Sequence, residues 1–322
     1  MNMHGAIFIC VMLTWSGVVL PENTPAMNPA INASSLTLAD RLRGHVTHLA
    51  VEIGPRNVFQ PRALHATADY IRREWSAQGY QVNSQFYETK GVKSENLEVI
   101  RMGKTRPGEI ILVGAHYDTV SGSPGADDNA SGVAALLELT RLFSATETAH
   151  TLRFVAFANE EPPFFFWGQM GSGVYAEAAK ARGDNIRLMI SLEMLGSYSE
   201  KPGSQGYPPL LGFFYPDQAN FIAMVSNRAS RKELHRLVAA FKAHSGFPVE
   251  SLATFEFIPG VAWSDHLSFW REGYPALMVT DTAFYRSDVY HSAEDTPEKL
   301  NYPAMAQVVE GLFHALNMLK LP

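Results

Sequence analysis

The sequence predicts an α/β protein built on a mostly parallel β-sheet that is covered on both faces. Strand-like apolar runs alternate with helix-like amphipathic segments through much of the chain, which is the pattern of strand–helix–strand units. The run TLRFVAFA at residues 151–158 is almost continuously apolar, as expected for a strand buried on both faces. With 322 residues, 46% of them hydrophobic, the chain is long enough to form one large domain.

The N-terminal third of the chain predicts two helices followed by strands. Apolar residues recur at helical spacing in residues 36–51 and 62–79, and the sequence GPRN separates the two segments. Residues 81–89 alternate polar and apolar, as a half-exposed strand does. Two further strands, 96–101 and 110–115, are expected to pair with each other through an intervening turn.

The remainder of the chain predicts alternating helices and strands without an internal repeat. Periodicity indicates helices at residues 130–144, 173–181, 221–244, 265–271 and 303–319. The expected strands lie at residues 151–158, 187–195, 210–215, 251–258 and 275–280. We therefore expect a single domain over residues 30–322 with a mostly parallel sheet.

Net charge argues against several classes of partner. The formal net charge is −6, and no run of Lys or Arg is dense enough to indicate binding to nucleic acid or to an anionic membrane. The expected partner is a small molecule or a peptide. The single cysteine, Cys10, lies in an N-terminal apolar segment, so a metal in the folded part would have to be held by His and carboxylate side chains.

The N-terminal apolar segment, residues 6–20, predicts export. It is too short for a stable membrane span and is typical of the apolar part of a signal peptide, followed by a polar linker to residue 29. We expect a periplasmic or secreted protein. Because residues 1–5 contain no Lys or Arg, an uncleaved anchor and a misassigned start codon remain alternatives.

Metal-binding side chains stand at the ends of predicted strands. These residues are His116, Asp128, Glu160, Glu161, Glu193 and His291. Each has an ordinary structural explanation when considered singly; Asp128, for example, precedes a predicted helix and suits an N-cap. Glu193 differs, because a carboxylate inside the apolar strand SLEML is expensive to bury unless it is paired or binds a cation.

Together these side chains predict a two-metal site. Two imidazoles and three carboxylates suit Zn²⁺ or a similar divalent ion, and neutralising so many acids takes two ions that share one carboxylate. A water held between ions about 3.5 to 4 Å apart becomes a nucleophile at neutral pH. Glu160 and Glu161 are adjacent, so their side chains point different ways and only one need face the ions. Glu160 is the candidate general base and then general acid.

The order of five motifs resembles a known enzyme family. HYD, PGADDNASG, NEE, EML and YHSAEDT follow one another as in the co-catalytic di-zinc exopeptidases of the bacterial leucyl aminopeptidase and glutamate carboxypeptidase family. The resemblance implies a three-layer α/β/α fold with a central mixed, mostly parallel sheet, and two Zn²⁺ ions. It implies this ligand set: His116 and Glu193 on one ion, Glu161 and His291 on the other, Asp128 bridging, and Glu160 as the base.

Further residues are assigned by the same resemblance. Asp118 looks like the family's carboxylate that orients the ligand imidazole. The sequence SDH at residues 264–266 matches a position near the active site, which makes Asp265 and His266 candidates for contact with substrate or ligands. No Tyr precedes this motif, so His266 is the candidate substitute for oxyanion stabilisation. The family commonly has Asp where Glu193 stands, and the longer side chain would shift one ion or change metal preference.

The resemblance implies an aminopeptidase that removes N-terminal residues from a peptide or small amide. Related ligand sets serve carboxypeptidases, amidohydrolases that act on acylated amino acids, and single-zinc glutaminyl cyclases, and these alternatives remain open. A receptor-like scaffold would be expected to have lost ligands, and none is lost here. The sequence carries no prediction of oligomeric state.

Overall fold

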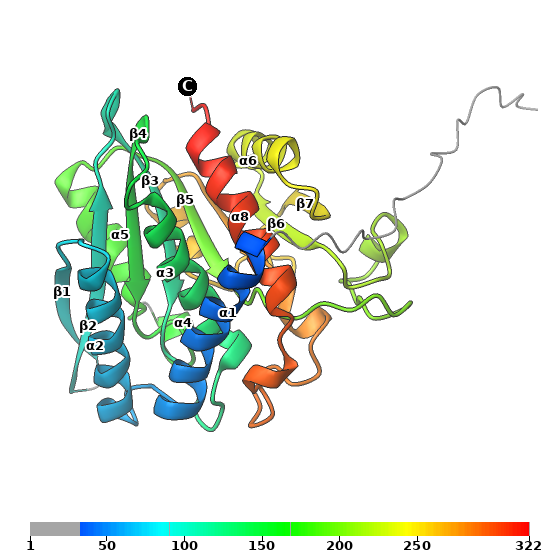
Figure 1. Cartoon of the computed structure of the whole chain (residues 1–322), viewed down its shortest axis with the longest axis horizontal. Coiled ribbons are helices and arrows are strands. Elements are labelled where there is room, and N and C mark those ends of the chain that lie inside the picture. Colours follow the sequence, from blue (N-terminus) through cyan, green and yellow to red (C-terminus); the bar gives the residue numbers. More distant parts are fainter. Residues whose placement is uncertain (1–32, 90, 168, 322) are drawn as a thin grey trace, which may run out of the picture. The chain divides into compact units, whose positions relative to one another are not determined.

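The central element of the structure is an eight-stranded mixed sheet with helices on both faces (Figure 1). The computed structural model describes residues 33–89, 91–167 and 169–321. The predicted signal segment and linker, residues 1–29, therefore lie outside the described residues. Among the described residues, no helix combines the length and apolar character needed to cross a membrane.

Strands and helices largely follow the predicted alternation. The strands are β1 (Asn83–Thr89), β2 (Val92–Arg101), β3 (Arg106–His116), β4 (His150–Phe157), β5 (Ile186–Glu193), β6 (Ile222–Asn227), β7 (Val249–Thr254) and β8 (Ala276–Thr280). The α-helices are α1 (Ala33–Thr47), α2 (Pro61–Ala77), α3 (Gly132–Phe143), α4 (Phe164–Trp167), α5 (Gly171–Arg182), α6 (Arg231–His244), α7 (His266–Arg271) and α8 (Tyr302–Met318). Two π-helical turns, η1 (His48–Ile53) and η2 (Ala126–Ser131), adjoin α1 and α3.

The strand order confirms the predicted mixed, mostly parallel sheet. The order is β1-β2-β4-β3-β5-β8-β6-β7. The four middle strands β4, β3, β5 and β8 run parallel to one another. At one end β2 pairs antiparallel with both β4 and β1, and at the other end β6 pairs antiparallel with β8. Parallel strands in the middle place their carboxyl ends at one edge of the sheet, where open α/β sheets hold their sites.

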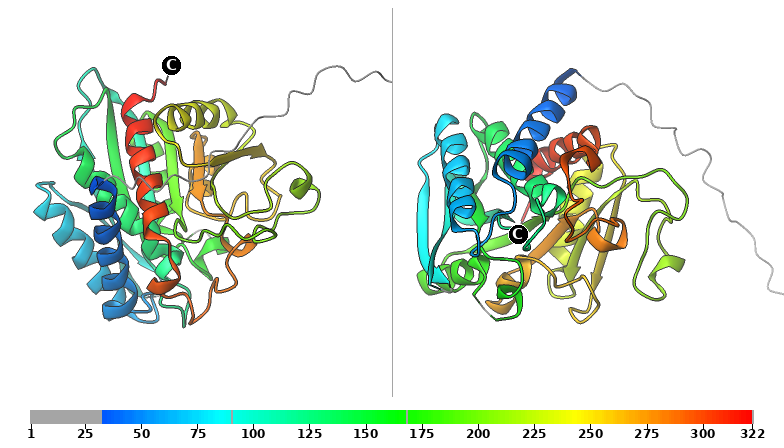
Figure 2. Two further views of the ribbon diagram at one scale, coloured as in Figure 1. Left: turned by 45° about the vertical axis from the view of Figure 1, so that its right-hand side comes forward. Right: turned by 90° about the horizontal axis from the view of Figure 1, so that it is seen from below.

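Apolar side chains pack the two faces of the sheet unequally. On the first face, α1, α2, α3, α6 and α8 form the larger core, to which Leu42, Leu136 and Val309 contribute fully buried side chains. On the second face, α5 and α7 form a smaller core around Tyr175 and Phe269. Figure 1 shows α1, α3 and α8 side by side in front of the sheet, and the left view of Figure 2 shows α1 in blue beside α8 in red. These layers confirm the three-layer α/β/α prediction.

The predicted pairing of the strands at residues 96–101 and 110–115 is wrong. These strands are β2 and β3, but β4 lies between them, antiparallel to β2 and parallel to β3. Burial explains the arrangement: the last seven residues of β3 are buried, so β3 belongs in the middle of the sheet, between β4 and β5.

The strand predicted at residues 210–215 is also wrong. The segment contains a single 3₁₀ turn, η3 (Leu211–Phe213), and Leu210 has a left-handed φ of 74°. Phe213 and Phe214 are 85% and 79% exposed, so their side chains gain no packing that would stabilise an extended strand there.

The helix predicted at residues 221–244 combines two different elements. Its first part is strand β6 and only its second part is helix α6. The segment IAMVSN is short and apolar, and β6 is mostly buried between β7 and β8. A short apolar run of this kind suits a buried strand as well as a helix, which is why periodicity misassigned it.

A buried carboxylate joins α1 and α3, two of the helices that cover the first face of the sheet. Glu138 of α3 is 1% exposed at its side chain; it accepts hydrogen bonds from Arg41 of α1 and from Arg141, both at 2.8 Å. His45 Nε2 of α1 lies 3.3 Å from its other oxygen. Burial acts to raise the pKa of Glu138, but the bonds from His45, Arg41 and Arg141 outweigh it and lower the pKa from 4.5 to about 2.

We expect Glu138→Gln to lower the free energy of unfolding by about 2 kcal/mol at pH 7, less than the full pKa shift implies because the two arginines are partly exposed. The folded-state pKa lies below the unfolded value, so this stabilisation is present above about pH 5 and is lost as the pH falls toward 2. Urea unfolding of wild type and variant across this range measures the difference. Glu147→Gln, which removes a carboxylate paired with Lys104 at the surface, is the matched control and should have little effect. Equal effects of the two substitutions at pH 7 would contradict the assignment.

Candidate metal centre

The carboxyl ends of the middle strands bring the predicted metal ligands together. His116 is the last residue of β3 and Glu193 is the last residue of β5, and these adjacent strands pair in parallel. Glu160 and Glu161 follow β4, the neighbour of β3 on its other side. Asp128 lies in η2, where the chain returns to the sheet before α3. His291 lies in a separate turn after β8, so the site draws on three neighbouring strands, on η2 and on the turn that carries His291.

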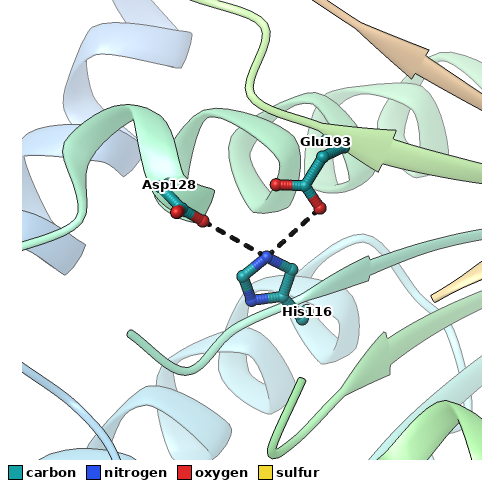
Figure 3. A group of neighbouring side chains, drawn as sticks. All are labelled: His116, Asp128 and Glu193. Carbon is teal, nitrogen blue, oxygen red and sulfur yellow. Dashed lines mark ion pairs between the residues drawn. The ribbon is translucent and has the colours of Figure 1, made fainter. Parts of the chain in front are cut away.

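One trio of side chains converges on the ring of His116 (Figure 3). His116 Nε2 lies 3.4 Å from Asp128 Oδ1 and 3.3 Å from Glu193 Oε2. All three residues are buried, and each offers one ligand atom to a common point. The trio has the composition of a divalent metal site.

A second trio shares one residue with the first. His291 Nε2 lies 3.1 Å from Asp128 Oδ2 and 3.2 Å from Glu161 Oε2. Asp128 thus directs one carboxylate oxygen toward each trio. A carboxylate placed in this way is positioned to bridge two ions.

Unsatisfied buried atoms show that this donor set fits metal ions. Both ring nitrogens of His116 and the Oδ1 atom of Asp128 are buried without a hydrogen-bond partner. Buried polar atoms normally have partners, so these atoms point to a ligand. Ligand atoms placed tetrahedrally around Zn²⁺ at its usual bond lengths are about 3.3 Å apart. The observed separations of 3.1 to 3.4 Å match that spacing.

Burial of so many acids changes their protonation. Burial raises the pKa of Glu160 well above its usual value, with Glu193 and Glu161 adding to the shift and His116 opposing it. Burial likewise raises the pKa of Glu161 to about 7. For His116, burial lowers the pKa, but the surrounding carboxylates, Glu193 foremost, outweigh it and raise the pKa well above the usual value. These shifts arise because several buried carboxylates crowd together and oppose one another's ionisation, and a bound cation would relieve that opposition.

The Glu160–Glu161 pair is held by its backbone. The Asp118 carboxylate accepts hydrogen bonds from the Glu160 N–H at 3.0 Å and the Glu161 N–H at 3.2 Å. The preceding residue, Asn159, has a left-handed φ of 59° and donates from its amide to Tyr87 Oη and Ser94 Oγ. Asp118 Oδ1 lies 3.6 Å from His116 Nδ1, longer than a hydrogen bond. The observed contacts of Asp118 thus orient the two glutamates more than the imidazole.

The segment 264–266 contributes unequally to the site. Ser264 Oγ donates to Glu193 Oε2 at 2.7 Å and also contacts Ser191. Asp265 is fully buried, and burial raises its pKa to about 7. His266 Nε2 donates to the Val261 carbonyl at 2.8 Å, and burial lowers its pKa to about 4. The ring of His266 is therefore neutral and serves a backbone contact, whereas Ser264 is the member that touches a predicted ligand.

Loop contacts fix the position of Asp128. The Asp295 carboxylate accepts hydrogen bonds from the N–H groups of Asp127 and Asp128 at 2.8 and 3.1 Å. Asp127 Oδ1 accepts from the Gly196 N–H, and the Asn129 amide donates to the Leu192 carbonyl. These contacts of Asp127 and Asn129 are thus with backbone groups and not with the two trios.

Arg56 locks the same loop from beneath. Its guanidinium is fully buried and donates to the carbonyls of Tyr117 at 2.8 Å, Pro124 at 2.6 Å and Gly125 at 2.9 Å. Burial lowers the pKa of Arg56 to about 10, with Asp295 foremost among the acids that oppose the shift. Arg56 therefore stays charged at neutral pH and ties the end of β3 to the turn that carries Asp128.

The structure brings all six principal candidates to one edge of the sheet, and three supporting residues were not predicted. Arg56, Ser264 and Asp295 act by orienting backbone or a ligand, not as ligands themselves. Two of them stand inside recognisable motifs, SDH and YHSAEDT, which is the signal that could have identified them. Arg56 follows the helix-breaking GP sequence and carries no comparable signal.

Comparison with protein families gives one match to the model described as Peptidase family M28, over residues 96–316. The uncharacterized protein YfbL of Escherichia coli is 41% identical, with 86% of this chain and 87% of that protein covered. A probable leucine aminopeptidase of Arthroderma benhamiae is 30% identical over 82% of this chain and 78% of that protein.

Solved structures share the fold at low sequence identity. The zinc aminopeptidase BSAP from Bacillus subtilis has a TM-score of 0.70 and 16% identity, with 86% of this chain and 94% of that chain covered. A glutaminyl cyclase from Fimbriiglobus ruber has a TM-score of 0.66 and 20% identity, with 88% and 95% covered. The fold therefore does not by itself separate a peptidase from a cyclase.

We expect Arg56→Met to lower the free energy of unfolding by about 3 to 5 kcal/mol, because the substitution leaves several buried carbonyls without donors. Denaturant unfolding measures this loss. Arg62→Met, which replaces an exposed arginine in the first turn of α2, is the control and should leave stability nearly unchanged. A loss no larger than that of the control would show that the carbonyls find other partners.

Proposed function

The chain belongs to peptidase family M28, and from that premise we propose that it is a zinc-dependent aminopeptidase that removes N-terminal residues from peptides. One observation carries the proposal: Asp128 belongs to both trios, and each of its two oxygens lies beside a different histidine, with one glutamate completing each trio. The leucine aminopeptidase relative and the zinc aminopeptidase of the same fold support it.

Two ions would be held by the residues described. His116, Glu193 and one oxygen of Asp128 would hold the first ion; His291, Glu161 and the other oxygen of Asp128 would hold the second. Bound zinc supplies Lewis acidity to the scissile carbonyl and to the attacking water. The protein contributes the spacing of the ligands and, through Ser264, the orientation of Glu193.

Glu160 is the residue proposed to move the proton. It is buried beside the trios, and no hydrogen bond to its carboxylate comes from any described residue, so the carboxylate is free to contact water. The water oxygen forms a bond to the scissile carbon while Glu160 takes the proton. The carbon–nitrogen bond then breaks and Glu160 gives the proton to the leaving amine. Asp118 holds the Glu160 backbone in place for both transfers.

We expect the purified protein to bind about two equivalents of Zn²⁺, measured by elemental analysis after removal of loosely bound metal. Asp128→Asn should lower the zinc content at both positions, because one oxygen of Asp128 faces each trio. Asp288→Asn, an exposed carboxylate, serves as the control. About one equivalent in the wild type would favour the cyclase, and none would favour a scaffold without chemistry.

A panel of aminoacyl, N-acetylated and C-terminal peptide substrates tests the activity. We expect chelator-sensitive cleavage of substrates with a free amino terminus. Glu160→Gln should retain zinc but lower kcat by roughly 10²- to 10⁴-fold, the usual contribution of general acid–base catalysis. Cleavage confined to N-blocked or C-terminal substrates would overturn the aminopeptidase assignment, and full activity of the variant would remove Glu160 from the mechanism.

A further inference from the structure

A pocket begins at the metal centre and extends along the second face of the sheet. Glu193 lines its inner end, and the strands β8, β6 and β7 contribute its floor. Helices α5 and α7 pack on the second face closer to the middle of the sheet, around β2, β5 and β8. The pocket therefore occupies the part of this face that lies toward the β7 edge, at the right of the sheet in Figure 1.

Strand register places both ends of the pocket in one straight row. Glu193 pairs with Thr280 of β8, Thr280 pairs with Ala223 of β6, and Ala223 pairs with Glu250 of β7. Residues directly opposite each other in a sheet point to the same face. Three strand spacings separate Glu193 from Glu250, which is roughly 14 Å. All four side chains line the pocket, so a carboxylate stands at each end of the row.

The surface between these two carboxylates is mostly apolar. A second row, Met278, Val225 and Leu252, runs beside the first and lines the same pocket. Leu211 and Tyr215 contribute to the wall formed by the segment 205–215. In the first row Ala223 has the smallest side chain, which leaves room between Thr280 and Glu250. The pocket is thus a channel for an apolar chain.

Glu250 is a charged side chain at the far end of this channel that an apolar occupant would leave without a partner. Its side chain is half-buried, and among the described residues it receives no hydrogen bond and forms no ion pair. Burial raises the pKa of Glu250, and the exposed Lys242 of α6 partly offsets the shift. A carboxylate inside an apolar pocket costs free energy unless a partner arrives to pair with it.

We propose that the pocket receives the side chain of the substrate's N-terminal residue and that Glu250 selects a cationic group at its far end, so that arginine and lysine are preferred. The inference rests on the proposed aminopeptidase function. A lysine or arginine side chain combines an apolar stem of three or four methylenes with a charged end. The stem matches the apolar rows and the charged end matches Glu250. With the reacting carbonyl held beside Glu193, the extended side chain spans the remaining distance along the row.

The test compares two substrates that differ only at the end of the side chain. Lysine and norleucine aryl amides share the methylene stem, but only lysine carries a charge. We expect the ratio of kcat/KM for lysine over norleucine to fall by about 5- to 10-fold in Glu250→Gln, the range for one partly buried ion pair. Glu272→Gln neutralises a carboxylate of similar exposure that does not line the pocket, and it should leave the ratio unchanged.

A ratio unchanged in Glu250→Gln would overturn the inference while leaving the aminopeptidase proposal intact. Binding of lysinol and norleucinol, which contain no scissile bond, separates the two proposals by calorimetry. If no aryl amide is cleaved but lysinol binds more tightly than norleucinol only when Glu250 is present, cation selection stands and the aminopeptidase function falls. Equal binding of the two alcohols by the wild type would overturn cation selection.

Discussion

The structure depends on keeping several buried carboxylates at one edge of a sheet. Glu160, Glu161, Glu193 and Asp128 are all less than 10% exposed, and like charges at this separation oppose one another. Some of the charge is met by the fold, since Ser264 and the N–H of Val120 donate to two of these groups. Oxygens of Asp128, Glu161 and Glu193 lie within 3.1 to 3.4 Å of the ring nitrogens of His116 and His291. Bound cations would offset this repulsion, so a metal ion held at the site would also stabilise the fold.

The two faces of the sheet differ in how completely helices cover them. The first face is covered by the larger helical layer and supplies rigidity behind the strands that end in His116 and Glu193. The second face is packed by helices only in part, and strands β6 and β7 extend it toward the edge. Because β6 runs antiparallel to β8, residues near its amino end lie level with the carboxyl end of β5. A recognition surface is thereby placed in line with the reacting groups.

Much of the site could be predicted because the candidate ligands are polar residue types at positions where the surrounding sequence is apolar. A carboxylate in the apolar strand SLEML and paired glutamates after a buried strand stand out locally in the sequence. The supporting residues do not: Arg56 acts on carbonyls about sixty residues further along the chain, and Asp295 on N–H groups about one hundred and seventy residues earlier. The wrong pairing of β2 with β3 has the same origin, since the strand that separates them comes from later in the chain. Local sequence patterns identify the candidate ligands, whereas contacts between distant parts of the chain determine which residues orient them.

The contacts of Arg56 link the N-terminal segment of the chain to the turn that precedes Asp128. The stretch shared with peptidase family M28 starts at residue 96, yet the guanidinium that secures the turn before Asp128 belongs to a segment forty residues earlier. The guanidinium also donates to the carbonyls of Leu49 and Gly54, so it joins η1 to the turn that precedes Asp128. The N-terminal helices are thus part of the scaffold of the metal site, and the range matched by the family model is narrower than the folded unit that holds the site.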